Sequence, residues 1–333
     1  MSDALPDGLH DFLGGSEWEG AEIAPLVGDA SFRRYFRLHR GERSAMLMHA
    51  PPPHEDPRPF LHVARWLGDN GLRAPEILLS DADKGWVLTE DFGDTRVKEW
   101  LDDHPGEAHD IYSGAIETLV QLHRQPAGPL PPYDMATYQR EAALFVEWFC
   151  PAAGLQVDVT GWAAAWEQVL TPLLDRQEPG VTVLRDYHAE NIMLLEPSRL
   201  GGAQGLIDFQ DALVGHPAYD LVSLLQDARR DVAPHLEHDM LCRYRAAVDP
   251  GEHFEDDYIR LGAQRNAKIV GIFTRLAERD GKARYLDLIP RVWTYLERDL
   301  SHAVMAPVAL WFDANIPPAL RELRGDLLAF DRG

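Results

Sequence analysis

The sequence predicts an α+β fold of two lobes, with a small β-rich N-lobe over residues 1–93 and a larger α-rich C-lobe over residues 94–333. Three observations support this prediction. The chain has 333 residues, which is enough for two domains or one bilobal protein. Short apolar and aromatic runs fill the first ninety residues or so, whereas the sequence beyond Gly93 has mostly helical spacing. A compact β segment over residues 181–209 interrupts these helices.

The N-lobe is expected to contain five strands and one helix. Turn residues such as Gly28-Asp29 and Asp83-Lys84-Gly85 separate the strands. The expected strands are Glu22–Leu26, Phe32–Leu38, Ser44–Met48, Ile77–Ser80 and Trp86–Glu90. The helix is expected over residues 59–70, because its apolar residues fall on one face and Gly71 follows as a C-terminal cap.

The C-lobe is expected to consist mainly of helices. Their apolar residues recur at helical spacing over residues 107–124, 135–150, 162–174, 235–247, 255–279, 284–303 and 318–329. The interrupting β segment contains three short strands, Val181–Leu184, Ile192–Leu195 and Gly205–Phe209.

Composition excludes several classes of partner. The 54 acidic and 32 basic side chains give a net charge of -22, which repels nucleic acid and anionic lipid. No apolar run is long enough to span a membrane. The start of the chain has Asp3 and Asp7 where an export signal is basic, and the two cysteines are too few for a disulfide framework. A cytoplasmic monomer is therefore expected.

Two apolar strands of the C-lobe each end in an acidic residue. Asp186 follows the first strand, Asp208 lies at the end of the third, and Asn191 comes five residues after Asp186. Phosphoryl transfer needs a carboxylate that orients the attacking hydroxyl and accepts its proton, and it needs hard oxygen ligands for Mg²⁺. Asp186 suits the first role, and Asn191 and Asp208 suit the second.

The spacing matches the kinase patterns H-R-D-L-x-x-x-N and D-F-G in part. Leu184 stands where the histidine is usual, and Gln210 stands where the glycine is usual. The remaining histidines lack zinc-site spacing, and no G-x-S-x-G elbow is present. The pattern therefore favours a phosphotransferase over a zinc enzyme or a serine hydrolase.

The stretches RDYHAEN and LIDFQDALVGHPAYDLVSLL resemble the aminoglycoside phosphotransferase superfamily, which has a protein-kinase-like fold. The resemblance runs from about residue 24 to about residue 260. Further phrases resemble the bacterial kinases that phosphorylate the anomeric hydroxyl of N-acetylmuramate and N-acetylglucosamine in peptidoglycan recycling; they are GDASFRRYFRL, MHAPP, RPF, TEDFGD and QRNAKIVGIF. The resemblance implies a small-molecule kinase that uses ATP and Mg²⁺.

The resemblance also implies roles for particular residues. Asp186 matches the catalytic base, and Asn191 and Asp208 match the Mg²⁺ ligands. His188 falls where protein kinases have a lysine that contacts the γ-phosphate, so it is a second catalytic candidate. Asp220 matches a structural acid of the C-lobe.

The resemblance places a phosphate-covering loop at residues 28–35 and an interlobe hinge at residues 89–93. The nucleotide-binding candidates are Gly28, Ala30, Ser31, Phe32, Arg33, Arg34, Glu90 and Phe92. The loop has one glycine instead of three, but alanine and serine are small enough for backbone N–H groups to approach phosphate. At the hinge, the backbone is expected to read the adenine edge.

The N-lobe lacks the lysine that usually binds the α- and β-phosphates, because no lysine precedes Lys84. The helix over residues 59–70 also lacks the glutamate that usually pairs with that lysine. Arg33, Arg34 and Arg37 are the expected substitutes, since arginine binds phosphate bidentately and stays charged. Strand alternation indicates that one of Arg33 and Arg34 faces the nucleotide.

A sugar site needs polar groups on a partly apolar, aromatic floor. The candidates for substrate binding are Glu147, Trp148, Asp211, Arg265 and Asn266. Arg265 is a candidate partner for the lactyl carboxylate of N-acetylmuramate.

Two alternatives to an amino-sugar kinase stay open. The first is a kinase for another small alcohol, such as an aminoglycoside, choline or homoserine; the acidic composition is compatible with a cationic acceptor. The second is a nucleotide-binding pseudokinase, which the missing lysine and Leu184 suggest. The intact set of Asp186, Asn191 and Asp208 favours an active enzyme. The resemblance of the N-lobe and QRN phrases favours a sugar and ATP as its partners.

Overall fold

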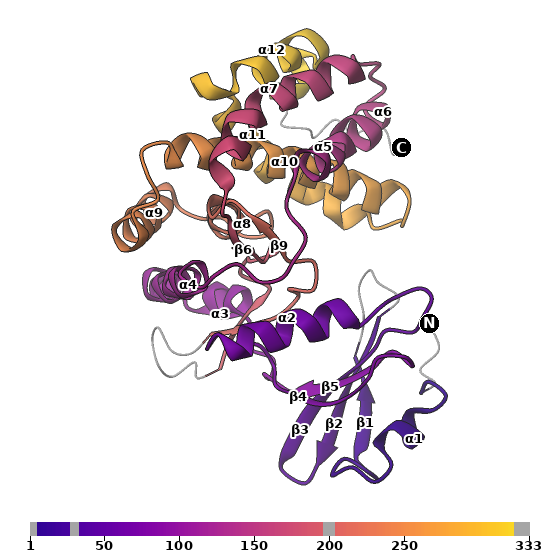
Figure 1. The fold of residues 1–333 in the computed structure, drawn as a ribbon. Helices are drawn as coiled ribbons and strands as arrows, with labels where there is room; N and C mark the ends of the chain where they lie inside the picture. The colour runs from indigo at the N-terminus through magenta and orange to yellow at the C-terminus, as the bar shows by residue number, and fades with distance from the viewer. Residues whose placement is uncertain (1–4, 27–32, 196–203, 323–333) are drawn as a thin grey trace. The chain divides into compact units, whose positions relative to one another are not determined.

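The computed structural model describes residues 5–26, 33–195 and 204–322 (Figure 1). The chain forms two compact units. The first consists of Met1–Gly114 and Glu190–Asp211, and the second of Ala115–Ala189 and Ala212–Gly333. An antiparallel sheet in the first unit and a mainly helical second unit confirm the expected α+β class. The expected lobe boundary between residues 93 and 94 stays a prediction.

The first unit contains a five-stranded antiparallel sheet in the order β1-β2-β3-β5-β4. Its strands are β1 (Glu22–Pro25), β2 (Arg34–Arg40), β3 (Arg43–His49), β4 (Ile77–Asp81) and β5 (Trp86–Glu90), which are the five expected ones. The predicted hairpin turn between β4 and β5 is also present. Gly85 in this turn has a φ of 79°, and a Cβ there would lie 2.3 Å from the carbonyl oxygen of Ala50, so the turn requires glycine.

The two faces of this sheet pack against different helices. Leu47 of β3 belongs to a core cluster with residues of α1 (Leu9–Leu13), and the next residue, Met48, belongs to a cluster with α2 (Arg58–Asp69). This separation follows from the alternation of side chains along a strand. The unit is completed by α3 (Val97–Asp103), the 3₁₀ helix Pro105–Glu107, the start of α4 (Ala108–His123) and the hairpin of β7 (Ile192–Leu194) and β8 (Gln204–Leu206).

The second unit is mainly helical, with one short antiparallel strand pair, β6 (Val181–Val183) and β9 (Leu213–Gly215). Its helices after α4 are α5 (Met135–Leu144), the π-helical turn Phe145–Phe149, α6 (Cys150–Ala152), α7 (Val159–Gln177), α8 (Ala218–Leu225), α9 (Pro234–Val248), α10 (Phe254–Glu278), the 3₁₀ helix Ala283–Leu288, α11 (Ile289–Leu300), the 3₁₀ helix Ala303–Met305, α12 (Ala306–Asn315) and α13 (Pro318–Glu322).

Helix α10 is the central helix of the second unit and packs against α5, α8 and α11. Gly271 permits its close approach to the end of α5, because a Cβ at this position would lie 2.3 Å from the carbonyl carbon of Leu144. Unlike a surface helix, α10 also buries polar side chains, including Gln264, Arg265 and Asn266. Of these three residues, Arg265 approaches the candidate site residue Asp186.

Several elements differ from the sequence prediction. The helix expected over residues 135–150 contains a π-helical turn. The one expected over 284–303 begins as the 3₁₀ helix Ala283–Leu288, and α11 follows from Ile289. Helices α1, α3, α8 and α12 and strand β9 were not predicted. The end of the helix expected over 318–329 lies outside the described residues. In the described part of the chain, none of the helices has the length and apolar character needed to cross a membrane.

Candidate active site

In the second unit, Asp186 follows a strained turn that begins after β6. Arg185 has a φ of 72°, a left-handed conformation that costs roughly 1–3 kcal/mol in a residue other than glycine. The carboxylate of Asp220 on α8 stabilises this turn by accepting the backbone N–H of Leu184 at 2.7 Å and that of Arg185 at 2.8 Å. Burial raises the pKa of Asp220 to about 7. These bonds agree with the structural role that the sequence resemblance implied for Asp220.

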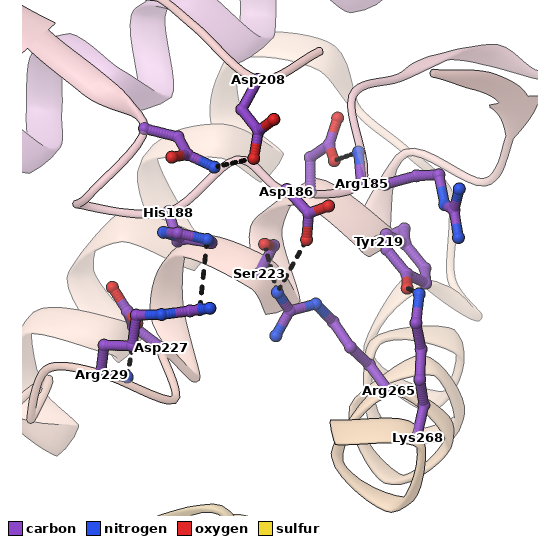
Figure 2. Close-up of polar contacts among 12 residues, drawn as sticks. Arg185, Asp186, His188, Asp208, Tyr219, Ser223, Asp227, Arg229, Arg265 and Lys268 are labelled. Atoms are coloured by element: carbon purple, nitrogen blue, oxygen red, sulfur yellow. Dashed lines mark hydrogen bonds and ion pairs between the residues drawn. The ribbon is translucent and has the colours of Figure 1, made fainter. Parts of the chain in front are cut away.

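The side chain of Asp186 faces Arg265 of α10 (Figure 2). Oδ1 of Asp186 lies 4.0 Å from Nη2 of Arg265, and the same Nη2 donates to Oγ of Ser223 at 2.8 Å. The Asp186 side chain is 47% exposed. Burial favours its neutral form, but nearby positive charges led by Lys268 outweigh that effect and lower the pKa of Asp186. The carboxylate is therefore ionised at neutral pH and accessible to an acceptor.

Behind Asp186, a buried glutamate binds two cations. Nζ of Lys268 lies 3.0 Å from Oε2 of Glu141, and Arg185 donates to the other carboxylate oxygen. Tyr133 also donates its hydroxyl to Glu141, and Lys268 donates to Tyr219 at 3.3 Å (Figure 2). Each buried charge thus has a partner, as burial of charge requires.

His188 is buried next to Arg229 and is neutral at pH 7. Its Nε2 lies 3.3 Å from Nη1 of Arg229, and Asp227 accepts the backbone N–H of Arg229 at 2.8 Å (Figure 2). Burial lowers the pKa of His188 to about 4, although the charge of Asp227 opposes this shift. A neutral imidazole does not supply the positive charge of the kinase lysine at this position. The catalytic role of His188 stays a prediction.

In the first unit, Asn191 and Asp208 lie side by side next to the β7–β8 hairpin. Nδ2 of Asn191 donates to Oδ2 of Asp208 at 3.3 Å, and Nε2 of Gln210 donates to Oδ1 at 2.9 Å. Asp208 is exposed and has a φ of 61°, while Phe209 is buried and stacks on Phe60 of α2. Exposed carboxylate and amide oxygens suit Mg²⁺, which typically takes one or two protein ligands and completes its shell with phosphates and water.

Arg33 and Arg34 have different partners within the first unit. Nε of Arg33 lies 3.1 Å from Oε2 of Glu55, whereas the guanidinium of Arg34 lies 5.1 Å from the ring centre of Phe36. Burial lowers the pKa of Arg33, but acidic groups that include Glu55 and Asp208 raise it overall. Arg33 is thus the arginine whose charge interacts with the candidate metal ligand.

The glutamate missing from α2 is present just before it. Glu55 precedes the first residue of α2, Arg58, and forms with Arg33 an ion pair of the kind that lysine and glutamate form in kinases. The other loop candidates, Gly28, Ala30, Ser31 and Phe32, lie outside the described residues, so their roles stay predictions.

The side chains of the predicted hinge are held by arginines. Arg73 donates to Glu90 at 2.7 Å and lies 4.9 Å from the ring centre of Phe92. Arg37 lies 2.8 Å from Asp91 and 2.8 Å from Asp94. Arg37 thus pairs with two carboxylates at the predicted hinge, and its phosphate role stays a prediction.

The predicted substrate residues occupy different environments. Glu147 is exposed and Trp148 is half-buried on the π-helical turn, while Asp211 is exposed in the first unit. Asn266 is fully buried and hydrogen-bonded to Gln226. Of the five, Arg265 is the one that the second unit places next to Asp186.

Several residues that contact the candidate residues within each unit were not predicted. In the first unit this is Glu55, and in the second unit they are Glu141, Ser223, Asp227, Arg229 and Lys268. Lys268 is one of only four lysines in the chain, which is a signal that could have singled it out, but its partner Glu141 lies far away in the sequence. In the described residues, no group of three or more His, Cys, Asp or Glu side chains is arranged to hold a metal ion.

The chain belongs to the phosphotransferase enzyme family (APH), whose characteristic sequence matches residues 22–258. It is therefore a phosphotransferase. It is 40% identical to the N-acetylmuramate/N-acetylglucosamine kinase of Pseudomonas aeruginosa over 89% of each chain. It is 36% identical to the kinase of the same name from Caulobacter vibrioides, over 93% of this chain and 96% of that relative.

Solved structures with low sequence identity share the fold. The gentamicin–APH(2")-IIa complex matches with a TM-score of 0.62 and 14% identity, over 92% of this chain and 99% of that chain. A choline/ethanolamine kinase family protein from Mesorhizobium loti matches with a TM-score of 0.61 and 15% identity, over 91% of this chain and 96% of that chain. The predicted protein-kinase-like fold is confirmed.

Proposed function

We propose that this chain transfers the γ-phosphoryl group of ATP to the anomeric hydroxyl of N-acetylmuramate, N-acetylglucosamine or both, as a step of peptidoglycan recycling. The relatives named as N-acetylmuramate/N-acetylglucosamine kinases support the choice of acceptor, since they match over most of both chains. The observation that carries the chemistry is the ionised, half-exposed carboxylate of Asp186 on its fixed turn.

In this reaction, Asp186 orients the C1 hydroxyl of the sugar and accepts its proton. The hydroxyl oxygen forms a bond to the γ-phosphorus as the bond from that phosphorus to the β,γ-bridging oxygen of ATP breaks, and ADP leaves. Little covalent chemistry falls to the protein, so orientation of the acceptor is the main contribution of Asp186.

Asn191 and Asp208 are the residues that would hold Mg²⁺. Their oxygens are of the hard type that this ion prefers, and Asp208 is exposed to solvent. When bound, Mg²⁺ neutralises charge on the phosphates. Gln210 donates to Asp208 and thereby fixes the direction of its carboxylate.

The first unit supplies the proposed nucleotide contacts. Arg33, held by Glu55, is the proposed phosphate ligand, and the backbone near Glu90 and Phe92 is the proposed adenine contact. Gly28, Ala30, Ser31 and Phe32 complete the proposed nucleotide set. Arg34 packs over Phe36, and we propose no nucleotide contact for it. We further propose that residues 1–93 form the N-lobe of this enzyme and residues 94–333 form its C-lobe.

The proposed sugar contacts lie on exposed surfaces. Glu147, Trp148 and Asp211 are accessible enough to meet a ligand, whereas the burial of Asn266 favours a supporting role for it. We place the reaction in the cytoplasm, where ATP is available, and propose a monomer without nucleic-acid or membrane partners. The net charge of -22 supports the latter point.

A panel of acceptors tests this function. The purified chain is incubated with ATP and Mg²⁺ and with N-acetylmuramate, N-acetylglucosamine, an aminoglycoside, choline or homoserine, and ADP release is measured. We expect turnover on one or both amino sugars and a fall in kcat of roughly 10²–10⁴-fold in Asp186→Asn.

Other results would contradict the proposal in distinct ways. Turnover confined to choline, homoserine or an aminoglycoside would identify a kinase for a different alcohol. ATP binding without turnover on any acceptor would identify a pseudokinase, and full activity of Asp186→Asn would exclude Asp186 as the base.

A further inference from the structure

The guanidinium of Arg265 is buried and directed at Asp186. Arg265 is 3% exposed, and its Nη2 reaches both Oγ of Ser223, at 2.8 Å, and Oδ1 of Asp186, at 4.0 Å (Figure 2). Its Nη1 is inaccessible to solvent and has no hydrogen-bond partner among the described residues. Burial of a guanidinium is costly unless a carboxylate compensates its charge, and Asp186 is the carboxylate that Nη2 approaches.

Lys268 lies on the same face of α10, one turn after Arg265. Its ammonium group is bound by Glu141 at 3.0 Å and by Tyr219 at 3.3 Å, and these contacts fix its position. Because Glu141 also binds Arg185, one carboxylate serves two cations and leaves positive charge to act on Asp186.

We propose that Arg265 and Lys268 are positioning residues for Asp186, with Arg265 orienting its carboxylate directly and Lys268 acting at longer range through charge. This inference rests on the proposed role of Asp186 as the base that receives the sugar's proton. It reassigns Arg265 from the lactyl carboxylate of the substrate to the carboxylate of the protein.

The burial of Arg265 separates these two roles. A substrate carboxylate needs an accessible guanidinium, but Arg265 is almost fully buried while Asp186 is 47% exposed. An acceptor that enters from solvent therefore meets Asp186, and Arg265 lies behind it. On this view Arg265 acts equally on both amino sugars, whether or not they carry a lactyl group.

Charged and titratable groups face Asp186 from three elements. They are Arg185 and His188 on its own loop, Arg265 and Lys268 on α10, and Asp220 on α8. His188 is neutral at pH 7 and burial favours the neutral acid in Asp220, so the cations of α10 and Arg185 dominate. Loss of a cation from α10 should make Asp186 easier to protonate.

Two measurements on the variants Arg265→Gln, Arg265→Lys and Lys268→Met test the proposal. The first is the kinetics with each sugar. We expect kcat to fall roughly 10²-fold in Arg265→Gln on both sugars, with KM for each sugar changed by less than about 3-fold and partial rescue of kcat in Arg265→Lys.

The second measurement is the titration of the Asp186 carboxyl carbon by NMR. Its signal is assigned as the one that is missing in Asp186→Asn. Its midpoint should rise by about 1 pH unit in Arg265→Gln and Lys268→Met.

Arg260→Gln is the matched control. Arg260 is also a buried arginine of α10 with a carboxylate partner, Asp257 at 2.8 Å, but it is not among the groups that act on Asp186. We expect Arg260→Gln to lower Tm as the test variants do, without a shift of the Asp186 titration and with kcat within about 3-fold of the wild type.

If Arg265→Gln does not fold, Ser223→Ala provides a second test. It removes the other partner of Arg265 and should lower kcat on both sugars.

The outcomes distinguish this inference from the proposed function. An increase in KM for N-acetylmuramate alone would indicate that Arg265 binds the lactyl carboxylate of this substrate, and it would overturn the proposal. An unchanged Asp186 midpoint in both charge-removing variants would also overturn it. The titration needs no turnover, so it tests the positioning roles of Arg265 and Lys268 independently of activity. A wild type that phosphorylates neither sugar would refute the proposed function instead.

Discussion

At the scale of single residues, the ion pair of Arg33 with Glu55 is our proposed substitute for the lysine–glutamate pair of typical kinases. Arg33 is bound to Glu55, and its charge is influenced by Asp208. Arg34, one residue later, packs over Phe36 instead. Arg33 lies just before β2 and Arg34 is its first residue, and the two side chains have different partners.

Arg33→Ala should raise KM for ATP about 10-fold or more, which corresponds to a loss of about 1.4 kcal/mol of binding free energy. Arg34→Ala is the matched control and should change this KM by less than about 3-fold. Steady-state kinetics with ATP as the varied substrate measures both. Equal effects, or a larger effect of Arg34→Ala, would refute the assignment.

His188 makes the stability of the fold depend on pH. Its pKa is about 4 in the folded chain, compared with an ordinary value of 6.5, so the unfolded chain binds more protons between these values. The free energy of unfolding should therefore decrease by about 3 kcal/mol from this group as pH falls from 6.5 to 4.

Urea unfolding of His188→Gln at several pH values measures this contribution. The variant should lose less stability than the wild type over the same pH range. His109→Gln, which removes an exposed histidine, should keep the wild-type slope. If the free energy of unfolding changes equally with pH in His188→Gln and in the wild type, protonation of His188 does not destabilise the folded chain.

At the scale of elements, α10 holds Arg265 next to Asp186, the proposed base, and it packs closely against its neighbours. Gly271 allows this approach, and an added Cβ would lie 2.3 Å from the carbonyl carbon of Leu144. Gly271→Ala should therefore lower the free energy of unfolding by roughly 1–3 kcal/mol.

Gly68→Ala on α2 is the matched control for this substitution. Gly68 also lies in a helix, but a Cβ there would meet no atom within 4 Å. Alanine should stabilise this helix by roughly 0.4–1 kcal/mol. Chemical denaturation of both variants gives the comparison, and a stable Gly271→Ala would show that α10 can move away from α5.

The elements could be predicted where the chain follows its local pattern. The five strands of the sheet and the helix α2 follow period-2 and period-3.6 spacing, and the structure confirms them. The three residues of β9 are too few to carry a period, and the π-helical turn breaks a helical pattern that continues through it. These features depend on tertiary packing, which a local pattern does not contain.

At the scale of the whole molecule, the motif residues could be predicted but the residues that support them could not. Asp186, Asn191 and Asp208 occur at fixed spacings in one stretch of sequence. Glu141 and Lys268 come from distant helices, and only the fold brings them together beneath the Asp186 turn. The net charge of -22 likewise did not predict the cations near Asp186, which are Lys268, Arg265 and Arg185.

The position of the new phosphate on the sugar tests the central claim most directly. The wild type is incubated with ATP, Mg²⁺ and N-acetylmuramate or N-acetylglucosamine, and the product is examined by two-dimensional ³¹P–¹H NMR. We predict a phosphorus signal correlated with the anomeric proton, at a rate reduced roughly 10²–10⁴-fold in Asp186→Asn. A phosphorus signal correlated with any other sugar proton, or an equal rate in Asp186→Asn, would contradict an anomeric kinase that uses Asp186 as its base.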